Sequence, residues 1–129
     1  MLTKEFINPH LMGFTNTVAY TAQGIKTIVV SGQVGCEDGR FEETFEEQAE
    51  MAHRNLIEEL AAAGAGVADI IKINSYVVDL DPERSNALSQ AKAKYFTQTY
   101  QPASTLIGIS ALVMKQLQVE IEATAVIEV

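Results

Sequence analysis

The chain has 129 residues, 47% of them hydrophobic and 20% charged, which is the composition of one ordinary globular domain and not of a disordered segment. Its 9 Lys and Arg residues against 17 Asp and Glu residues give a net charge of −8. Because nucleic acids and anionic membranes are bound through basic clusters, this balance argues against both as partners. A single cysteine, together with the lack of a leader-like or membrane-spanning apolar stretch, favours a cytoplasmic location.

The first third of the chain predicts short strands. Lys4–Ile7 is expected to form a strand that ends at Asn8-Pro9, because proline restricts itself and the residue before it. Thr17–Ala22 and Ile25–Val34 are rich in β-branched residues and predict a hairpin that turns at Gln23-Gly24. Alternation in the second of these strands predicts one face with Ile28, Val30, Gly32 and Val34, and another with Thr27, Val29, Ser31 and Gln33. Gly35–Arg40 predicts a further turn.

A helix is predicted over Phe45–Ala63. Thr44 and Glu47 have the spacing of a capping box, in which each side chain bonds to the other's backbone amide. Gly64 and Gly66 follow the last periodic residue and are typical of a helix end. Apolar residues that recur every three or four positions predict its buried face: Phe45, Ala49, Ala52, Leu56, Leu60 and Ala63.

The second half predicts one more helix and three strands. Asp81-Pro82 has the residues of a helix start, and that helix is expected to reach about Gln98. The predicted strands are Ile70–Val78, Thr105–Ile109 and Gln118–Glu128. In the last strand, apolar residues alternate with Glu120 and Glu122, so that the two carboxylates share one face.

This order of elements predicts one α+β domain over residues 1–129, with two layers. Each helix connects two strands, and right-handed crossovers place both helices on the same face of the sheet. The other face is left open, with Ser31, Gln33, Glu120 and Glu122 beside the apolar Val29. A partly apolar face without cover is a typical surface for self-association.

Four stretches, read together, resemble the RidA/YjgF family of reactive-intermediate deaminases, also called endoribonuclease L-PSP or RutC-like proteins. They are Val30–Gly35, Asn55 to Gly64, Asp69 to Asp79, and Pro102-Ala103 combined with Val119–Ala123. The resemblance implies a chorismate-mutase-like fold with a mixed six-stranded sheet, assembled as a homotrimer with small-molecule clefts between subunits. Archetypal members hydrolyse enamine or imine intermediates without a metal or any other cofactor.

The resemblance also implies a set of site residues. Glu120 corresponds to the acid that positions the attacking water, and Ser31 with Gly32 to a ligand-binding strand. Phe14 stands where the family has a tyrosine, and Ser104 stands where active members have an arginine that binds the substrate carboxylate. A hydroxyl cannot supply that charge, so archetypal 2-aminoacrylate deamination is not expected.

We therefore expect a trimer that binds, and at most slowly hydrolyses, a small enamine- or imine-type metabolite. An active 2-iminobutanoate/2-iminopropanoate deaminase is the alternative within the enzyme class. A ligand-sensing or partner-binding trimer without catalysis is the alternative from another class. Ribonuclease activity is disfavoured by the net charge of −8.

The remaining reactive residues have simpler interpretations. Glu122 is expected to be structural, and Cys36, beside Glu37, is expected to be an inert thiol. His10 and His53 lack further ligands at metal-binding spacing and are both expected to be exposed. Lys115 is the cation expected nearest to Ser104, and an exposed loop position is its simpler interpretation.

Overall fold

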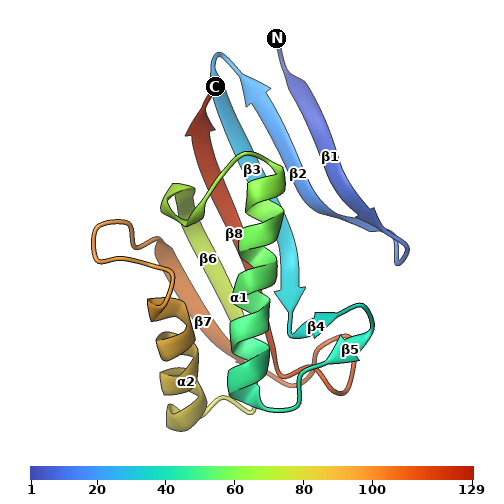
Figure 1. Ribbon diagram of the computed structural model, residues 1–129, viewed down its shortest axis with the longest axis vertical. Coiled ribbons are helices and arrows are strands. Elements are labelled where there is room, and N and C mark those ends of the chain that lie inside the picture. The colour runs from blue at the N-terminus through green and yellow to red at the C-terminus, as the bar shows by residue number, and fades with distance from the viewer.

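A computed structural model describes residues 1–129, and it has the predicted two layers: one six-stranded mixed sheet with both α-helices on one of its faces (Figure 1). The helices are α1 (Phe45–Ala62) and α2 (Pro82–Ala93), and Val67–Asp69 forms one 3₁₀ turn, η1. The strands are β1 (Thr3–His10), β2 (Phe14–Ala22), β3 (Ile25–Val34), β4 (Cys36–Glu37), β5 (Arg40–Phe41), β6 (Ile70–Val78), β7 (Ala103–Ile109) and β8 (Val119–Glu128).

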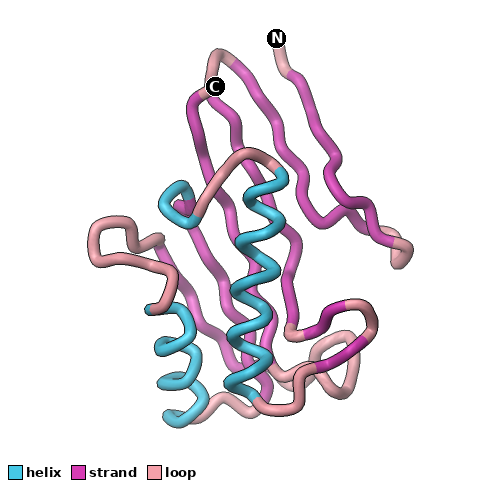
Figure 2. The backbone as a smooth tube through the Cα atoms, viewed as in Figure 1, coloured by secondary structure: helices cyan, strands magenta, loops and turns pink.

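The sheet has the strand order β1-β2-β3-β8-β6-β7, and only β6 and β7 are parallel. The helix α2 makes the crossover between these two parallel strands, as a parallel pair requires. Strands β4 and β5 form a separate small hairpin within the predicted turn at Gly35–Arg40. In the tube drawing of Figure 2 the helices lie together on one side, and the opposite face of the sheet has no cover. No helix is long and apolar enough to cross a membrane.

The hairpin of β2 and β3 turns at Gln23-Gly24 as predicted, with positive φ angles of 53° and 78° at the two turn residues. Strand β1 was predicted to end before Asn8-Pro9, and this prediction is wrong, because the strand continues to His10. The reason is its place at the edge of the sheet, where proline is tolerated. The backbone departs from regular strand geometry at Asn8, which has a φ angle of 58°.

The helix α1 begins and ends as its sequence predicts. Thr44 accepts a hydrogen bond from the Glu47 amide at 3.1 Å, and the Glu47 side chain accepts one from the Thr44 amide at 3.1 Å. Gly64 follows the helix with a φ angle of 89°. The predicted apolar face is buried against β3 and β8 and forms much of the single core: Phe45, Ala49, Ala52, Leu56, Leu60 and Ala63.

The helix α2 ends at Ala93, five residues before the predicted Gln98. It stops where aromatic and threonine residues begin, and these have lower helix propensity than the alanines before them. Phe96 leaves the helical path and packs into the core with 8% of its surface exposed. Residues 94–102 then form the loop that leads into β7.

A bulge in β3 changes which side chains face the helices. The pairing with β8 shifts register between Val30 and Gln33, so that Gln33 lies opposite Ile121 and Val34 opposite Glu120. Gln33 is therefore buried on the helix side, with 8% exposed. The predicted placement of Gln33 on the open face, and of Gly32 and Val34 on the buried face, is wrong for this reason. A bulge inserts one residue and reverses the alternation beyond it.

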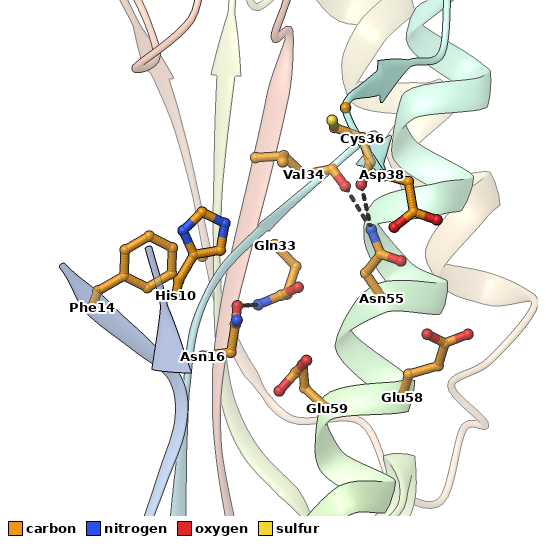
Figure 3. A pocket seen from close by; sticks show the side chains of 12 residues that line it. His10, Phe14, Asn16, Gln33, Val34, Cys36, Asp38, Asn55, Glu58 and Glu59 are labelled. Atoms are coloured by element: carbon orange, nitrogen blue, oxygen red, sulfur yellow. Dashed lines mark hydrogen bonds between the residues drawn. The ribbon is translucent and has the colours of Figure 1, made fainter. Parts of the chain in front are cut away.

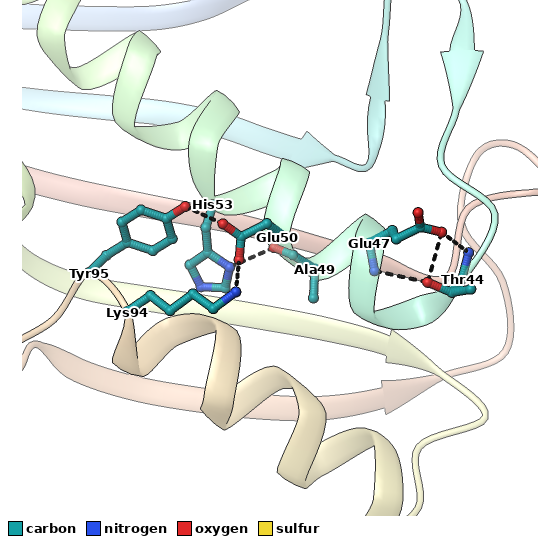
Figure 4. A network of polar contacts seen from close by, with 7 residues as sticks. All are labelled: Thr44, Glu47, Ala49, Glu50, His53, Lys94 and Tyr95. Atoms are coloured by element: carbon teal, nitrogen blue, oxygen red, sulfur yellow. Dashed lines mark hydrogen bonds and ion pairs between the residues drawn. The ribbon is translucent and has the colours of Figure 1, made fainter.

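His53 is buried with 1% exposed, so the prediction of an exposed side chain is wrong. It lies on the flank of α1 that is covered by the segment after α2, where the Tyr95 ring stacks on it at a centroid distance of 6.1 Å (Figure 4). Its Nδ1 lies 2.7 Å from the Ala49 carbonyl oxygen, whereas Nε2 has no hydrogen-bond partner. Tyr95 itself donates to Glu50 at 2.5 Å. Burial is the main reason that the pKa of His53 is lowered.

Candidate functional site

Glu120 and Glu122 of β8 share the open face of the sheet, as predicted, but they differ in their contacts. Glu122 accepts a hydrogen bond from the Tyr76 hydroxyl at 2.5 Å and a longer one from Asn74 at 3.4 Å. The bond to Glu122 is the largest reason that the pKa of Tyr76 is raised. Glu122 thus joins β8 to β6 through side chains, which agrees with the structural role expected for it.

Glu120 has no hydrogen-bond partner in the chain, although it is partly buried. Burial, followed by the charge of Glu122, raises the pKa of its carboxyl group. The carboxylate lies against Gly32 of β3, where a β-carbon would stand 2.0 Å from Oε1. Gly32 and Glu120, which the sequence assigned to one site, are therefore in direct proximity. A carboxylate with a raised pKa and free oxygens is suited to accept a proton from water.

A cavity of about 480 Å³ lies between the bulged end of β3, the β1–β2 turn and the middle of α1 (Figure 3). Gly32 and Phe14 both line it, so a second predicted ligand-binding residue comes close to the first. Phe14 stacks on His10 with a centroid distance of 4.7 Å and keeps 42% of its surface exposed. The other residues lining the cavity are Asn16, Gln33, Val34, Cys36, Asp38, Gly39, Asn55, Glu58 and Glu59.

The walls of this cavity are held by amide side chains that the sequence did not assign to the site. Asn55 of α1 donates to the backbone oxygens of Val34 at 3.0 Å and of Cys36 at 3.1 Å. Gln33 donates to Asn16 at 3.2 Å. The sequence gave one indication of these residues: Asn55 is the first residue of one of the four stretches that resemble the family. The pairing itself depends on how α1 lies along β3, which a single sequence does not give.

The two serines are already in hydrogen bonds. Ser31 donates to the Thr15 carbonyl oxygen at 2.7 Å. Ser104 lies in β7 opposite Ile73 of β6, exposed, and its Oγ accepts a hydrogen bond from Lys92 at 3.2 Å. The sequence reading named Lys115 as the cation nearest to Ser104, and this is wrong, because the helix α2 brings Lys92 to it.

Ser104 does not join the other site residues within one chain. Strands β8 and β6 lie between β3, which carries Gly32, and β7, which carries Ser104. The cavity between β3 and α1 is lined by neither Ser104 nor Glu120. One chain thus brings Gly32, Glu120 and Phe14 into one region and leaves Ser104 at the far edge of the sheet.

The chain gathers no group of three or more His, Cys, Asp or Glu side chains that could hold a metal ion. Cys36 is partly buried in the cavity wall, within β4. The groups gathered at the site are carboxylates, amides, hydroxyls, an imidazole and a thiol. These groups can bind a small polar molecule and move a proton.

The family model described as Endoribonuclease L-PSP matches residues 14–127. This range includes both helices and, apart from the last residue of β8, every strand of the large sheet but β1. The chain belongs to this family. The endoribonuclease L-PSP family is the one that the motifs around Gly32, Pro102 and Glu120 resembled, and the fold agrees with it.

The chain is also similar to individual proteins, of which three are described here. The RutC family protein YjgH of Escherichia coli is 36% identical over 86 residues, which are 66% of this chain and 65% of YjgH. The 2-iminobutanoate/2-iminopropanoate deaminase of Dermatophagoides farinae is 28% identical over 79% of both chains. The crystal structure of RidA from an Antarctic Psychrobacter species superposes with a TM-score of 0.77, at 28% identity over 92% of this chain and 93% of that one.

Proposed function

We propose that this protein is a RidA-type homotrimer that binds a small enamine- or imine-type metabolite in clefts between subunits and hydrolyses it with Glu120. The observation that carries the proposal is the state of Glu120, whose partly buried carboxylate has a raised pKa and no hydrogen-bond partner. The similarity to an imine deaminase of Dermatophagoides farinae supports the reaction type.

The reaction requires one water molecule and no external electron donor or acceptor. The water oxygen bonds to the imine carbon while Glu120 accepts one proton from that water, and the imine nitrogen takes up a proton. The resulting carbinolamine then loses ammonia, because the carbon–nitrogen bond breaks as the hydroxyl group gives up its proton and becomes the carbonyl. An enamine enters the same sequence after protonation at carbon, which converts it to the imine. Glu120 is the base in the first step and can return the proton to the leaving nitrogen.

The open face of the sheet supports the trimer. It exposes the apolar Val29 (47%) and Ile107 (44%) beside the partly buried Tyr76, whose strand β6 also carries Asn74. Faces of this kind are covered in stable assemblies. In a trimer, a neighbouring subunit could bring its Ser104 to the Gly32 and Glu120 that one chain keeps apart from it. Sedimentation velocity at micromolar concentration tests this, and a monomer would contradict both the assembly and the cleft.

The decisive activity test follows ammonia and 2-oxo acid release from an imine generated in the assay by an amino-acid oxidase. Glu120→Gln is expected to reduce release to the uncatalysed rate, because an amide cannot accept a proton from water. Glu122→Gln is the matched control: it lies on the same strand face, keeps a bond from Tyr76, and is expected to retain activity. Equal rates for the natural protein and Glu120→Gln would reject hydrolysis by this residue.

A trimer that binds the metabolite without turning it over is the second candidate. Two substitutions relative to the family pattern favour it, since Ser104 has no guanidinium and Phe14 has no hydroxyl. Specific binding of an imine-derived 2-oxo acid, combined with no catalysed ammonia release, would select this candidate over the enzyme.

A further inference from the structure

A buried glutamine in the wall of the cavity between β3 and α1 has an amide oxygen without a partner in the chain. Gln33 is 8% exposed, and its Nε2 donates to Asn16 Oδ1 at 3.2 Å and to the Ser31 carbonyl oxygen at 3.0 Å. Its Oε1 accepts no hydrogen bond, and Figure 3 shows it turned toward α1, away from Asn16. This oxygen remains accessible from the cavity, because His53 Nε2 is the one fully enclosed side-chain atom that lacks a partner.

Gln48, the other buried glutamine, shows the usual arrangement. It is 1% exposed, and its Nε2 donates to the backbone oxygens of Glu42 at 3.0 Å and Gln116 at 2.9 Å. Its Oε1 accepts a hydrogen bond from the Gln118 amide at 2.9 Å. Buried amides are normally bonded at both ends in this way. Gln33 therefore has one unmet acceptor, and it faces a cavity whose volume of about 480 Å³ is typical of small-molecule sites.

Asn55 repeats this arrangement on the α1 side of the cavity. Its Nδ2 gives both of its N–H groups to backbone oxygens, those of Val34 and Cys36. Since carbonyl oxygens only accept, these contacts and the one to Ser31 fix which end of each amide is nitrogen. Asn55 Oδ1 accepts no hydrogen bond in the chain. The amides of Gln33 and Asn55 thus have only oxygen atoms left to bind a ligand.

The carboxylates that line the cavity have no cationic partner. They are those of Asp38, Glu58 and Glu59, and no lysine or arginine lines the cavity with them. Neither of the two ion pairs of the chain involves any of the three. Glu59 accepts hydrogen bonds from neutral groups, the Thr17 hydroxyl at 2.8 Å and the Asn8 amide at 3.2 Å. The cavity therefore combines negative charge with free acceptors.

We propose that this cavity is a second ligand site, which binds a small organic cation of the amine or guanidine class. Such a cation carries a positive charge and several N–H donors, which the carboxylates and the two amide oxygens can accept. Phe14 and Val34 add apolar surface for a short carbon chain beside the charged group. Neither Glu120 nor Ser104 lines the cavity, so the inference does not depend on the proposed hydrolysis.

The test measures the affinity of agmatine for the full-length protein by titration calorimetry. Agmatine carries a guanidinium group and an ammonium group on a short carbon chain, and saturable binding is expected. Glu58→Gln combined with Glu59→Gln should weaken that binding about tenfold or more, because two charge-assisted hydrogen bonds are lost. Butylurea, in which an uncharged urea group replaces the guanidinium, should not bind detectably.

The matched control removes the same total charge outside the cavity. Glu43→Gln combined with Glu46→Gln changes two exposed carboxylates at the start of α1, neither of which lines the cavity. Because solvent and salt screen such distant charges, the affinity for agmatine should change by less than about twofold. An equal loss in this control would reduce the binding to a general attraction by the acidic chain and would overturn the inference.

A measurement on the natural protein covers variants that fail to fold. In the ¹⁵N-labelled protein, the side-chain amide signals of Gln33 should shift when agmatine is added, because a cation bonded to Oε1 polarises the amide group. Those of Gln48 should stay in place, because its oxygen is already bonded to the Gln118 amide.

The inference is rejected by unmoved Gln33 signals, and equally by the absence of saturable agmatine binding at millimolar concentration. Full affinity in the variant that combines Glu58→Gln with Glu59→Gln would also reject it, as would butylurea binding as tightly as agmatine. Hydrolysis by Glu120 is measured separately through ammonia release, so either proposal can fail without the other.

Discussion

The carboxylate of Glu120 lies over Gly32 in the space that a side chain at position 32 would occupy. A β-carbon there would stand 2.0 Å from Glu120 Oε1 and 2.5 Å from the carboxyl carbon. The smallest residue of β3 thus determines where the unpartnered carboxylate of Glu120 can lie. The contact joins two neighbouring strands, β3 and β8, at the point where the bulge of β3 begins.

Gly32→Ala is expected to remove activity without unfolding the protein. The three atoms nearest to the new methyl group all belong to the Glu120 side chain, which can rotate away from it, so the free energy of unfolding should change by less than about 1 kcal/mol. Displacement of the carboxylate by an ångström or more should lower kcat about a hundredfold. Gly66→Ala is the control, because the nearest atom to its β-carbon is at 4.0 Å. A Gly32→Ala variant with normal kcat would show that the position of Glu120 is unimportant.

Glu120→Gln is expected to raise the free energy of unfolding at pH 7 while it removes hydrolysis. Burial raises the folded-state pKa of this carboxyl, so folding favours its protonated form and the ionised form is unfavourable at neutral pH. The gain should disappear below about pH 4, where the carboxyl is protonated in both states. Urea unfolding of both proteins at the two pH values measures it. A variant less stable than the natural protein at pH 7 would contradict this account.

The same pKa predicts the pH dependence of hydrolysis. Glu120 acts as a base only when ionised, and its raised pKa means that it becomes protonated at a higher pH than an ordinary glutamate. The rate should therefore fall on acidification at a pH above the ordinary glutamate value. In Glu122→Gln the inflection should move to lower pH, since the neighbouring charge that helps to raise the pKa is gone. An inflection that stays in place would exclude Glu120 as the titrating group.

Stability is expected to fall on acidification because of His53. Its folded-state pKa is lowered by burial, so its contribution is present above the ordinary value of about 6.5 and is lost as pH falls toward the folded pKa. The free energy of unfolding should decrease as the pH falls below about 6.5. His53→Gln should reduce this dependence. Equal pH dependence in the natural protein and His53→Gln would contradict the assignment.

Asn55→Ala is expected to loosen the wall of the cavity. It removes the two hydrogen bonds that tie Val34 and Cys36 to α1 and should lower the free energy of unfolding by about 1–2 kcal/mol. Amide hydrogen exchange in β4 should become faster. Arg54→Ala, an exposed neighbour on the same helix, serves as control and should change stability by less than about 0.5 kcal/mol.

RNA is expected not to bind, in spite of the family name. A net charge of −8 leaves few cations to neutralise phosphates, and two of the nine are already paired with acids. Filter binding of single-stranded RNA should show no saturable affinity at physiological ionic strength. Tight binding that weakens steeply with salt would contradict this prediction.

The fold followed from local patterns that a single sequence carries. The capping box at Thr44 and the three-and-four spacing in α1 gave that helix to within one residue. The turn at Gln23-Gly24 gave the first hairpin. Where the sequence reading was wrong, the cause was not local: β1 continues through Pro9 because it is an edge strand, and Gln33 is buried because a bulge reverses the alternation of β3.

The candidate site was predictable only where its residues lie on adjacent strands. Glu120 and Gly32 come together because β8 pairs with β3, and the family-like motifs marked both. Lys92 could not be found, because its contact with Ser104 depends on the path of the chain after α2. The same limit applies to His53, which was expected to be exposed. Tyr95, from the loop after α2, stacks on it and covers it.

The irregular backbone of β1 at Asn8-Pro9 has a consequence for how copies of the chain can combine. Strand β1 is one outer border of the sheet, and at Pro9 it lacks the N–H that an added strand would need. Asn8, with its φ angle of 58°, bends the same border out of a regular ladder. A strand added at this border could not pair continuously past Asn8 and Pro9, which disfavours edge-to-edge growth of the sheet from this side.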